Sequence, residues 1–164
     1  MPITLQDAID HLYDLTVRQG KAQSPARLAV LADYCIEQLA ARGVHGVQSE
    51  QSIPGGGRSK AWDVAWKYDG KYRLAISLKS ILKNLAGTVP NRIDDLMGEA
   101  ANVQLHSPGW TIGTVEAFAY AEVDFSQSAL LLPSASEFDS FFDVLVEQVK
   151  LRNPNASPDE AGGR

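Results

Sequence analysis

The stretch 61-AWDVAWKYDGKYRLAISLKS-80 contains two apolar runs separated by the pair Asp69-Gly70. An Asp-Gly pair between such runs is a strong signal for the tight turn of a β-hairpin, so we expect two antiparallel strands here. Side chains alternate between the two faces of a strand. On the second strand one face is therefore apolar, and it carries Leu74, Ile76 and Leu78. The opposite face carries Arg73, Ala75, Ser77 and Lys79.

Two charged residues interrupt this hairpin: Asp63 on the first strand and Lys79 near the far end of the second. If the strands pair, both side chains can emerge at one end of the sheet. Mg²⁺ prefers oxygen ligands and often needs few protein carboxylates, because waters fill its remaining positions. Such a water can act as a nucleophile, and a lysine can position it and offset charge on a phosphate. The pair therefore suits metal-assisted phosphodiester hydrolysis, with an ordinary cross-strand ion pair as the alternative.

Two helices are predicted before the hairpin. Thr4 followed by Asp7 resembles a capping box and predicts a helix over residues 4–18. Ser24 and Pro25 predict the start of a second helix, which ends at Gly43.

Residues 44–60 end in IPGGGRSK, which predicts a mobile loop. Its glycines could approach phosphates closely, but they lack the Lys-Ser/Thr spacing of a P-loop.

A helix, further strands and a last helix are predicted after the hairpin. The helix over residues 90–105 has an expected apolar stripe of Ile93, Leu96, Met97, Ala100 and Val103. Its opposite face carries Arg92, Asp95, Glu99 and Asn102. Strands are expected over 111–123 and 129–133, and a helix from Ser136. This order predicts an α/β or α+β sandwich with a mixed sheet flanked by helices. We expect one domain over 1–152 and a disordered tail over 153–164.

Composition narrows the class of protein. The chain has 164 residues, 45% of them hydrophobic, which is enough for one domain with a sizeable core. No apolar run is long enough to span a bilayer, and the N-terminal stretch has acids where a signal peptide needs bases, so a cytoplasmic location is expected. Cys35 is the only cysteine, which excludes an intrachain disulfide and a cysteine zinc cage. Its helical pattern predicts a core position.

The net charge of −5 is unevenly distributed. Residues 55–92 carry eight basic and two acidic side chains, a local charge of +6, so the remainder carries −11. A polyanion responds to the local field, and this segment could therefore bind phosphates despite the acidic total. A solvated hairpin is the alternative.

The three histidines predict no familiar catalytic centre. His11 lies in the first predicted helix, His45 precedes the glycines and His106 lies at a helix end. None accompanies a G-x-S-x-G motif, and no pair at helical spacing encloses a glutamate. A nucleophilic triad and a zincin site are therefore disfavoured.

The segments KAWDVAWKYDGKYRLAISLKS and NRIDDLMGEA together resemble the PD-(D/E)XK nuclease superfamily, and within it the XhoI-like type II restriction endonucleases. The resemblance covers residues 60–102. The matching positions are Lys60, Trp62, Asp63, Gly70, Lys79, Ser80, Asn91, Arg92, Asp94, Asp95 and Gly98. The resemblance implies a restriction-endonuclease-like fold with a mixed sheet flanked by helices. It also implies cleavage of double-stranded DNA that depends on Mg²⁺, for which Mn²⁺ could substitute. A palindromic DNA site would favour a homodimer.

The chain departs from this family at one decisive position. Ser77 occupies the place of the second acid, two residues before the lysine, and a serine hydroxyl is a poor metal ligand. Some restriction enzymes of the superfamily carry Ser-x-Lys and recruit a glutamate from the following helix. Glu99 is therefore our candidate for the missing acid, and Asp95, one turn earlier on the same face, is the second candidate. The alternatives are that Glu99 is a solvated surface acid, or that the protein is an inactive nuclease-fold protein that binds DNA or a protein partner.

The resemblance also implies roles for the neighbouring residues. Asp63, Glu99 and the main-chain carbonyl of Leu78 would bind Mg²⁺, Lys79 would orient the attacking water, and Ser77 would hold a water. Phosphate contacts are expected from Arg58, Lys60, Lys83, Asn91 and Arg92. Glu37 weakly resembles a helix acid that many members aim at the site, and a surface glutamate beside the core is the alternative. Trp62 and Trp66 are expected in the core. RNA or branched DNA remains an alternative substrate.

Overall fold

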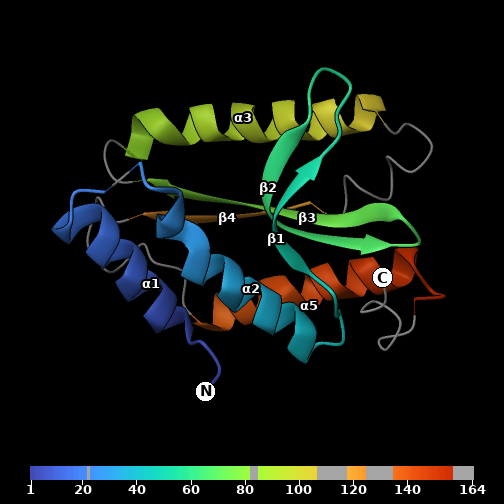
Figure 1. Cartoon of the computed structure of the whole chain (residues 1–164), viewed down its shortest axis with the longest axis horizontal. Coiled ribbons are helices and arrows are strands. Elements are labelled where there is room, and N and C mark those ends of the chain that lie inside the picture. The colour runs from blue at the N-terminus through green and yellow to red at the C-terminus, as the bar shows by residue number, and fades with distance from the viewer. Residues whose placement is uncertain (22, 82–84, 107–117, 125–134, 157–164) are drawn as a thin grey trace.

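The computed structural model describes residues 1–21, 23–81, 85–106, 118–124 and 135–156 (Figure 1). Four strands form one sheet in the order β1-β2-β3-β4. Their bounds are β1 Gln48–Ile53, β2 Lys60–Tyr68, β3 Lys71–Ile81 and β4 Phe118–Asp124. The first three strands are antiparallel, whereas β4 runs parallel to β3. A parallel pair needs a crossover connection, and α3, Leu85–His106, lies in it.

The predicted hairpin is confirmed. Asp69 and Gly70 both have positive φ, 52° and 69°, as a type I′ turn requires. The strands on either side pair Val64 with Ile76 and Ala65 with Ala75. The register shifts between Trp66 and Lys67, where the pairing is irregular.

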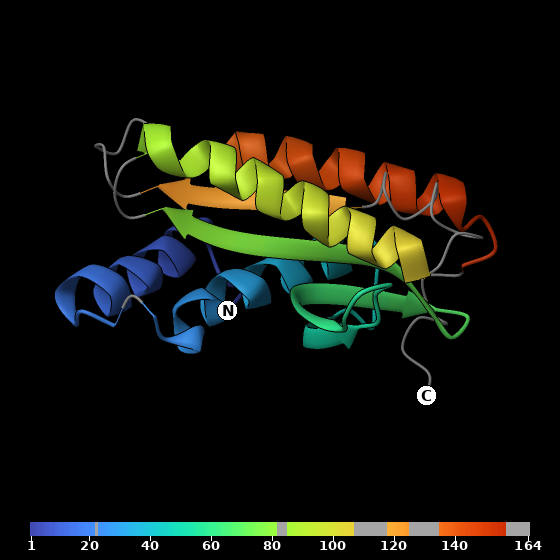
Figure 2. The same ribbon diagram turned by 90° about the horizontal axis from the view of Figure 1, so that it is seen from above.

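Helices cover both faces of the sheet. The helix α1 spans Leu5–Tyr13, α2 spans Ala29–Ala41 and α5 spans Ala135–Arg152. These three lie on one side of the sheet, and α3 lies on the other (Figures 1 and 2). The result is a mixed α+β fold. Within the described ranges, no helix combines the length and the apolar character needed to cross a membrane.

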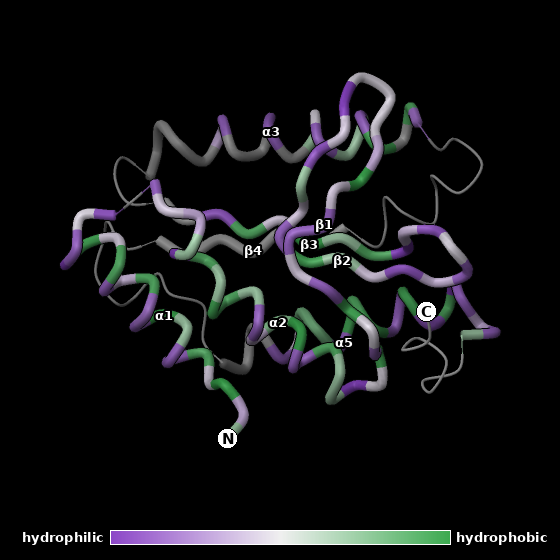
Figure 3. Tube along the Cα trace, viewed as in Figure 1, coloured by the Kyte–Doolittle hydropathy of each residue, from purple (hydrophilic) through white to green (hydrophobic). Residues whose placement is uncertain are grey.

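The sheet has a hydrophobic core on each face. The larger core joins the sheet to α1, α2 and α5, and it contains Leu74, Ile76 and Leu78, as predicted from their alternation. Figure 3 shows the apolar segments of the strands at the centre of the molecule. The smaller core consists of Ile53, Trp62, Ala65, Ala75 and Val103, the last of these from α3. Trp66 belongs to the larger core, so both tryptophans are buried as expected.

The N-terminal helices follow the prediction with two differences. The Thr4 hydroxyl accepts a hydrogen bond from the Asp7 N–H at 3.1 Å and the Thr4 N–H donates to the Asp7 carboxylate at 2.9 Å, which confirms the capping box. The α-helix ends at Tyr13, and residues 14–18 are π-helical. Here the buried Thr16 hydroxyl donates to the Leu12 carbonyl at 2.6 Å, a bond that distorts helices. The second helix begins with a 3₁₀ turn, Pro25–Leu28, and the Ser24 side chain makes no cap.

The expected mobile loop over residues 44–60 is wrong, because residues 48–53 form the edge strand β1. Four of its six residues, Gln48, Ser49, Glu50 and Ser52, are exposed, so it has no apolar alternation from which a strand can be predicted. Residues Gly55–Gly57 contact α3, as described below.

The C-terminal elements also differ from the prediction. The helix α3 begins at Leu85 instead of residue 90, which places Pro90 inside it. Phe142, Leu145 and Val149 of α5 lie in the larger core. The disordered tail does not begin at Asn153, because that residue is buried and its side chain donates to the Val149 carbonyl at 2.9 Å. Residues 111–117, the strand over 129–133 and residues 157–164 lie outside the described residues.

Candidate active site

Asp63 lies where β2 separates from β3. The paired register extends to Val64 opposite Ile76, and at the next step the Asp63 carboxylate accepts a hydrogen bond from the Leu78 N–H at 2.6 Å. The Asp63 carboxylate thus accepts the hydrogen bond that a backbone carbonyl of β2 would accept if the two strands were paired at this point. The N–H and C=O of one strand residue point to the same edge, so the Leu78 carbonyl also faces the Asp63 side of β3.

Glu99 faces the sheet, not the solvent. Its exposed fraction is 8%, whereas that of Met97 is 67%. The expected apolar stripe of α3 is therefore wrong at Met97, although Val103 is buried as predicted. The turn of α3 that carries Glu99 packs against a group of charged residues, and this explains why a glutamate can replace an apolar side chain there.

Two lysines from the sheet reach the same oxygen of Glu99. The Lys60 ammonium forms an ion pair with Glu99 Oε1, and Lys79 Nζ lies 3.6 Å from that atom. Glu99 Oε2 is buried and has no hydrogen-bond partner within the described parts of the chain. Asp63 is within the electrostatic reach of both ammonium groups. Lys79 and Lys60 thus each interact with both acids, with Glu99 through an ion pair and with Asp63 electrostatically, and Lys60 joins the residues that the sequence singled out.

Burial dominates the electrostatics of this cluster. It raises the pKa of Asp63, although the Leu78 N–H and the charges of Lys79 and Lys60 act in the opposite direction. Burial also lowers the pKa of Lys60, and repulsion from Lys79 and Arg58 adds to this effect, whereas Asp95 and Asp63 oppose it. The ion pair with Glu99 stabilises the ammonium form of Lys60. Carboxylates and amines with perturbed pKa values in one cluster are typical of functional sites.

The thiol of Cys35 lies on the α2 side of this cluster. Burial raises its pKa to about 12, and the Asp63 carboxylate contributes in the same direction. The thiol is therefore protonated and unreactive at neutral pH. It belongs to the larger core, as predicted from the helical pattern.

A glycine-rich loop is fixed to α3 next to the cluster. The Asn102 side chain accepts hydrogen bonds from the N–H groups of Gly57 and Arg58 at 2.9 and 3.3 Å, and it donates to the Arg58 carbonyl at 2.8 Å. A Cβ on Gly55 would lie 2.0 Å from the Asn102 amide nitrogen, and one on Gly56 would lie 2.4 Å from Leu105 Cβ. The glycines thus permit close contact with the helix, and the loop fixes the backbone just before Lys60. The sequence predicts Asn102 only as a member of the face opposite the apolar stripe of this helix, and no local signal indicates its contact with the loop.

The remaining predicted residues lie at varying distances from the cluster. Arg58 is exposed and electrostatically close to Lys60, and Asp95 is exposed on α3. Asn91 is exposed on the same helix, which also includes Arg92, and Lys83 lies outside the described residues. Ser77 is buried, with an exposed fraction of 2%. The Glu37 carboxylate accepts a hydrogen bond from the Ile3 N–H at 2.7 Å, so it fastens the N-terminal segment and does not join the cluster.

The cluster fits a hydrated divalent cation. Groups of three or more acidic, histidine or cysteine side chains suited to a metal do not occur among the described residues. Mg²⁺, however, is commonly held by one or two carboxylates together with waters, and Asp63 and Glu99 supply two. The buried Glu99 Oε2 is an acceptor that lacks a donor, which costs free energy unless a cation or a water binds it.

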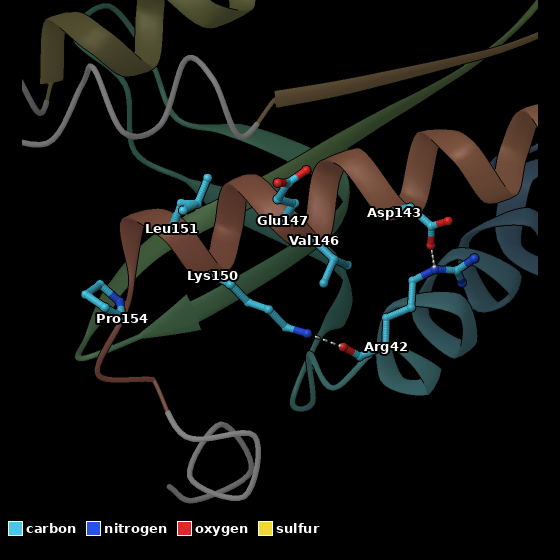
Figure 4. Close-up of a pocket in the computed structure, with 7 residues that line it drawn as sticks. All are labelled: Arg42, Asp143, Val146, Glu147, Lys150, Leu151 and Pro154. Atoms are coloured by element: carbon cyan, nitrogen blue, oxygen red, sulfur yellow. Dashed lines mark hydrogen bonds and ion pairs between the residues drawn. The ribbon is translucent and has the colours of Figure 1, made fainter.

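A separate hollow lies across the sheet from α3. It has a volume of about 620 Å³ and is lined by residues of α5, from Asp143 to Leu151, and by Arg42 and Pro154 (Figure 4). Arg42 and Lys150 have partners there, since Arg42 contacts Asp143 at 2.7 Å and Lys150 donates to the Arg42 carbonyl at 3.0 Å. These contacts join α5 to the residue that follows α2.

Comparisons with models of known protein families, with curated proteins and with solved structures found no match for this chain. A functional assignment therefore depends on the chemistry of the Asp63, Lys79, Glu99 and Lys60 cluster.

Proposed function

We propose that the chain is a Mg²⁺-dependent endodeoxyribonuclease of restriction type, with the restriction-endonuclease-like fold of the PD-(D/E)XK superfamily. One observation carries the proposal: Glu99 extends from α3 to Lys79, with its carboxylate buried beside the two strands of the hairpin. The acid that the family motif lacks at Ser77 is thereby supplied from the neighbouring helix.

The chain's own groups have distinct tasks in this proposal. Asp63, Glu99 and the Leu78 carbonyl would hold Mg²⁺. When bound, the ion would stabilise negative charge on the phosphate and increase the acidity of water. Lys79 would donate a hydrogen bond to the attacking water and offset the charge that develops on the phosphate. The Leu78 N–H holds the Asp63 carboxylate in place at 2.6 Å, so this acid is oriented before substrate arrives.

Phosphate contacts would come from the basic residues around the cluster. Lys60 belongs to the cluster and Arg58 is electrostatically close to Lys60, and Lys83, Asn91 and Arg92 complete the proposed set. The substrate would be double-stranded DNA with a palindromic recognition sequence, and a homodimer would match the symmetry of that sequence. The location of the protein would be cytoplasmic. Phosphate contacts carry no sequence information, so base readout would come from other residues.

The test is cleavage of plasmid DNA by the purified protein with Mg²⁺ or Mn²⁺, over a range of salt and protein concentrations. We expect Glu99→Gln and Lys79→Ala to abolish cleavage and to retain the circular dichroism spectrum of the parent. Glu147→Gln is the matched control, because Glu147 is an exposed acid on α5, across the sheet from α3. RNA and branched DNA as competitors identify the preferred substrate.

The outcomes separate the alternatives. If the parent protein leaves DNA intact under all conditions, the enzyme proposal fails, and an inactive nuclease-fold protein that binds DNA or a protein partner replaces it. If the parent cuts and Glu99→Gln cuts equally well, only the relocated acid is wrong.

A further inference from the structure

The cluster is electrically balanced before any metal ion arrives. Asp63 and Glu99 contribute two negative charges, and Lys60 and Lys79 contribute two positive charges. Both ammonium groups approach the same atom, Glu99 Oε1. A nuclease site of the proposed kind needs one lysine beside the cation, so the second lysine requires an explanation.

A divalent cation cannot simply be added to this arrangement. A divalent cation near the two carboxylates is repelled by both ammonium groups, and this repulsion opposes its binding. Movement of one ammonium group away from Glu99 relieves the repulsion. Displacement becomes favourable if a negatively charged group arrives at the same time to receive the displaced lysine.

Lys60 is better placed to move than Lys79. Lys79 lies on β3, between β2 and β4 in the sheet, whereas Lys60 is the first residue of β2 and follows the glycine-rich loop. The exposed fractions of the two side chains are similar, 27% for Lys60 and 22% for Lys79, so both flexible stems have a route to solvent and it is the place in the sheet that distinguishes them. It also experiences repulsion from both Lys79 and Arg58.

We propose that Lys60 has two binding partners in turn: Glu99 in the free protein, where its ammonium group takes the place of a divalent cation, and a phosphate of the substrate once the cation has bound. This inference depends on the proposed function. Cation binding and nucleic-acid binding then favour one another, because each helps to release or receive Lys60. The effect is reciprocal, as any coupling between two binding equilibria must be.

The test measures cation binding directly, without catalysis. Mn²⁺ is titrated into the metal-free full chain, and unbound Mn²⁺ is measured by electron paramagnetic resonance. We expect Lys60→Met to bind Mn²⁺ about tenfold or more tightly than the parent. Lys71→Met is the matched control, because it removes the same charge from the exposed turn of the same hairpin, and it should bind as the parent does. Lys60→Gln is a second variant in case Lys60→Met does not fold.

A DNA arm tests the coupling itself. The affinity for a short duplex, followed by fluorescence anisotropy, should increase on addition of Ca²⁺ in the parent, and this increase should be smaller in Lys60→Met. Equal Mn²⁺ affinity in the parent and both Lys60 variants, with loss of binding in Glu99→Gln, would overturn the role of Lys60 and leave the cation site intact. Mn²⁺ binding that Glu99→Gln does not change would overturn the cation site itself.

Discussion

At the scale of single residues, Asp63 combines a structural and a proposed chemical task. Its carboxylate accepts a hydrogen bond from the Leu78 N–H, so it completes the pairing of β3 where β2 departs. Burial raises its pKa, which means that the folded chain holds the charged form at a cost. Residues kept for function commonly carry such a cost.

Asp63→Asn should therefore stabilise the protein at neutral pH and abolish cleavage. The amide oxygen can still accept from Leu78, while the buried charge is removed. The pKa of Asp63 is higher in the folded protein than in the unfolded chain. The ionised carboxylate therefore lowers the free energy of unfolding at pH values above the folded-state pKa, and this loss disappears as the pH falls toward the unfolded-state pKa. We expect a Tm a few degrees above that of the parent near pH 7 and an equal Tm near pH 4, measured by circular dichroism. A variant that is less stable than the parent at pH 7 would contradict this account.

At the scale of elements, α3 joins three separate parts of the molecule. Val103 contributes to the smaller core, Glu99 reaches the lysines, and Asn102 fixes the glycine-rich loop. One helix face thus sets the positions of both the loop and the proposed acid.

Asn102→Ala should release the loop. It removes three hydrogen bonds to Gly57 and Arg58, and we expect a loss of about 1–3 kcal/mol in the free energy of unfolding, measured with urea. Trypsin should also cleave more rapidly after Arg58. The control is Gly98→Ala on the same helix, where a new Cβ meets nothing within 4 Å and should add about 0.5–1 kcal/mol of stability. Unchanged stability and proteolysis in Asn102→Ala would show that the contacts with Asn102 do not hold the loop.

Local signals predicted some elements well and others poorly, for physical reasons. The Asp69-Gly70 turn and the Thr4 capping box need only their own residues, and both are confirmed. The strand β1 was missed because an exposed edge strand requires no apolar alternation. The rotation of α3 was wrong because Met97 is apolar yet exposed, whereas Glu99 is charged yet buried by partners from other elements.

The candidate site was predictable only in part. Asp63 and Lys79 stand out because they lie within apolar strands, and Glu99 follows from the resemblance to the nuclease superfamily, in which Ser77 occupies the place of an acid. The ion pair of Lys60 with Glu99 joins the start of β2 to the middle of α3. No local pattern specifies such a contact, so Lys60 was expected only as a phosphate ligand.

At the scale of the whole molecule, charge is segregated along the chain. The net charge is −5, but the segment over residues 55–92 carries +6 and includes the β-hairpin that bears Asp63 and Lys79. A polyanion would be repelled by most of the surface and attracted to this segment. The proposed DNA contacts should therefore depend strongly on salt.

Arg58→Ala should weaken duplex binding by a similar factor for all sequences, because a phosphate contact does not read bases. The slope of log affinity against log salt concentration should decrease in magnitude by about 1. The measurement is fluorescence anisotropy of a labelled duplex in increasing NaCl, with Lys21→Ala as a control because this exposed lysine lies outside the basic segment. An equal effect of both substitutions would indicate that only total charge matters.

The attachment of Glu99 to a helix, and not to the strand that carries Lys79, limits how this chain can vary in length. Each residue inserted or deleted within α3 before Glu99 turns every later side chain by about 100° around the helix axis. One such change would swing the carboxylate out of the cluster, and Asn102 would lose the glycine-rich loop along with it. Relatives of this chain should therefore tolerate extra residues at the Asp69-Gly70 turn, but conserve the number of residues between the start of α3 and Glu99.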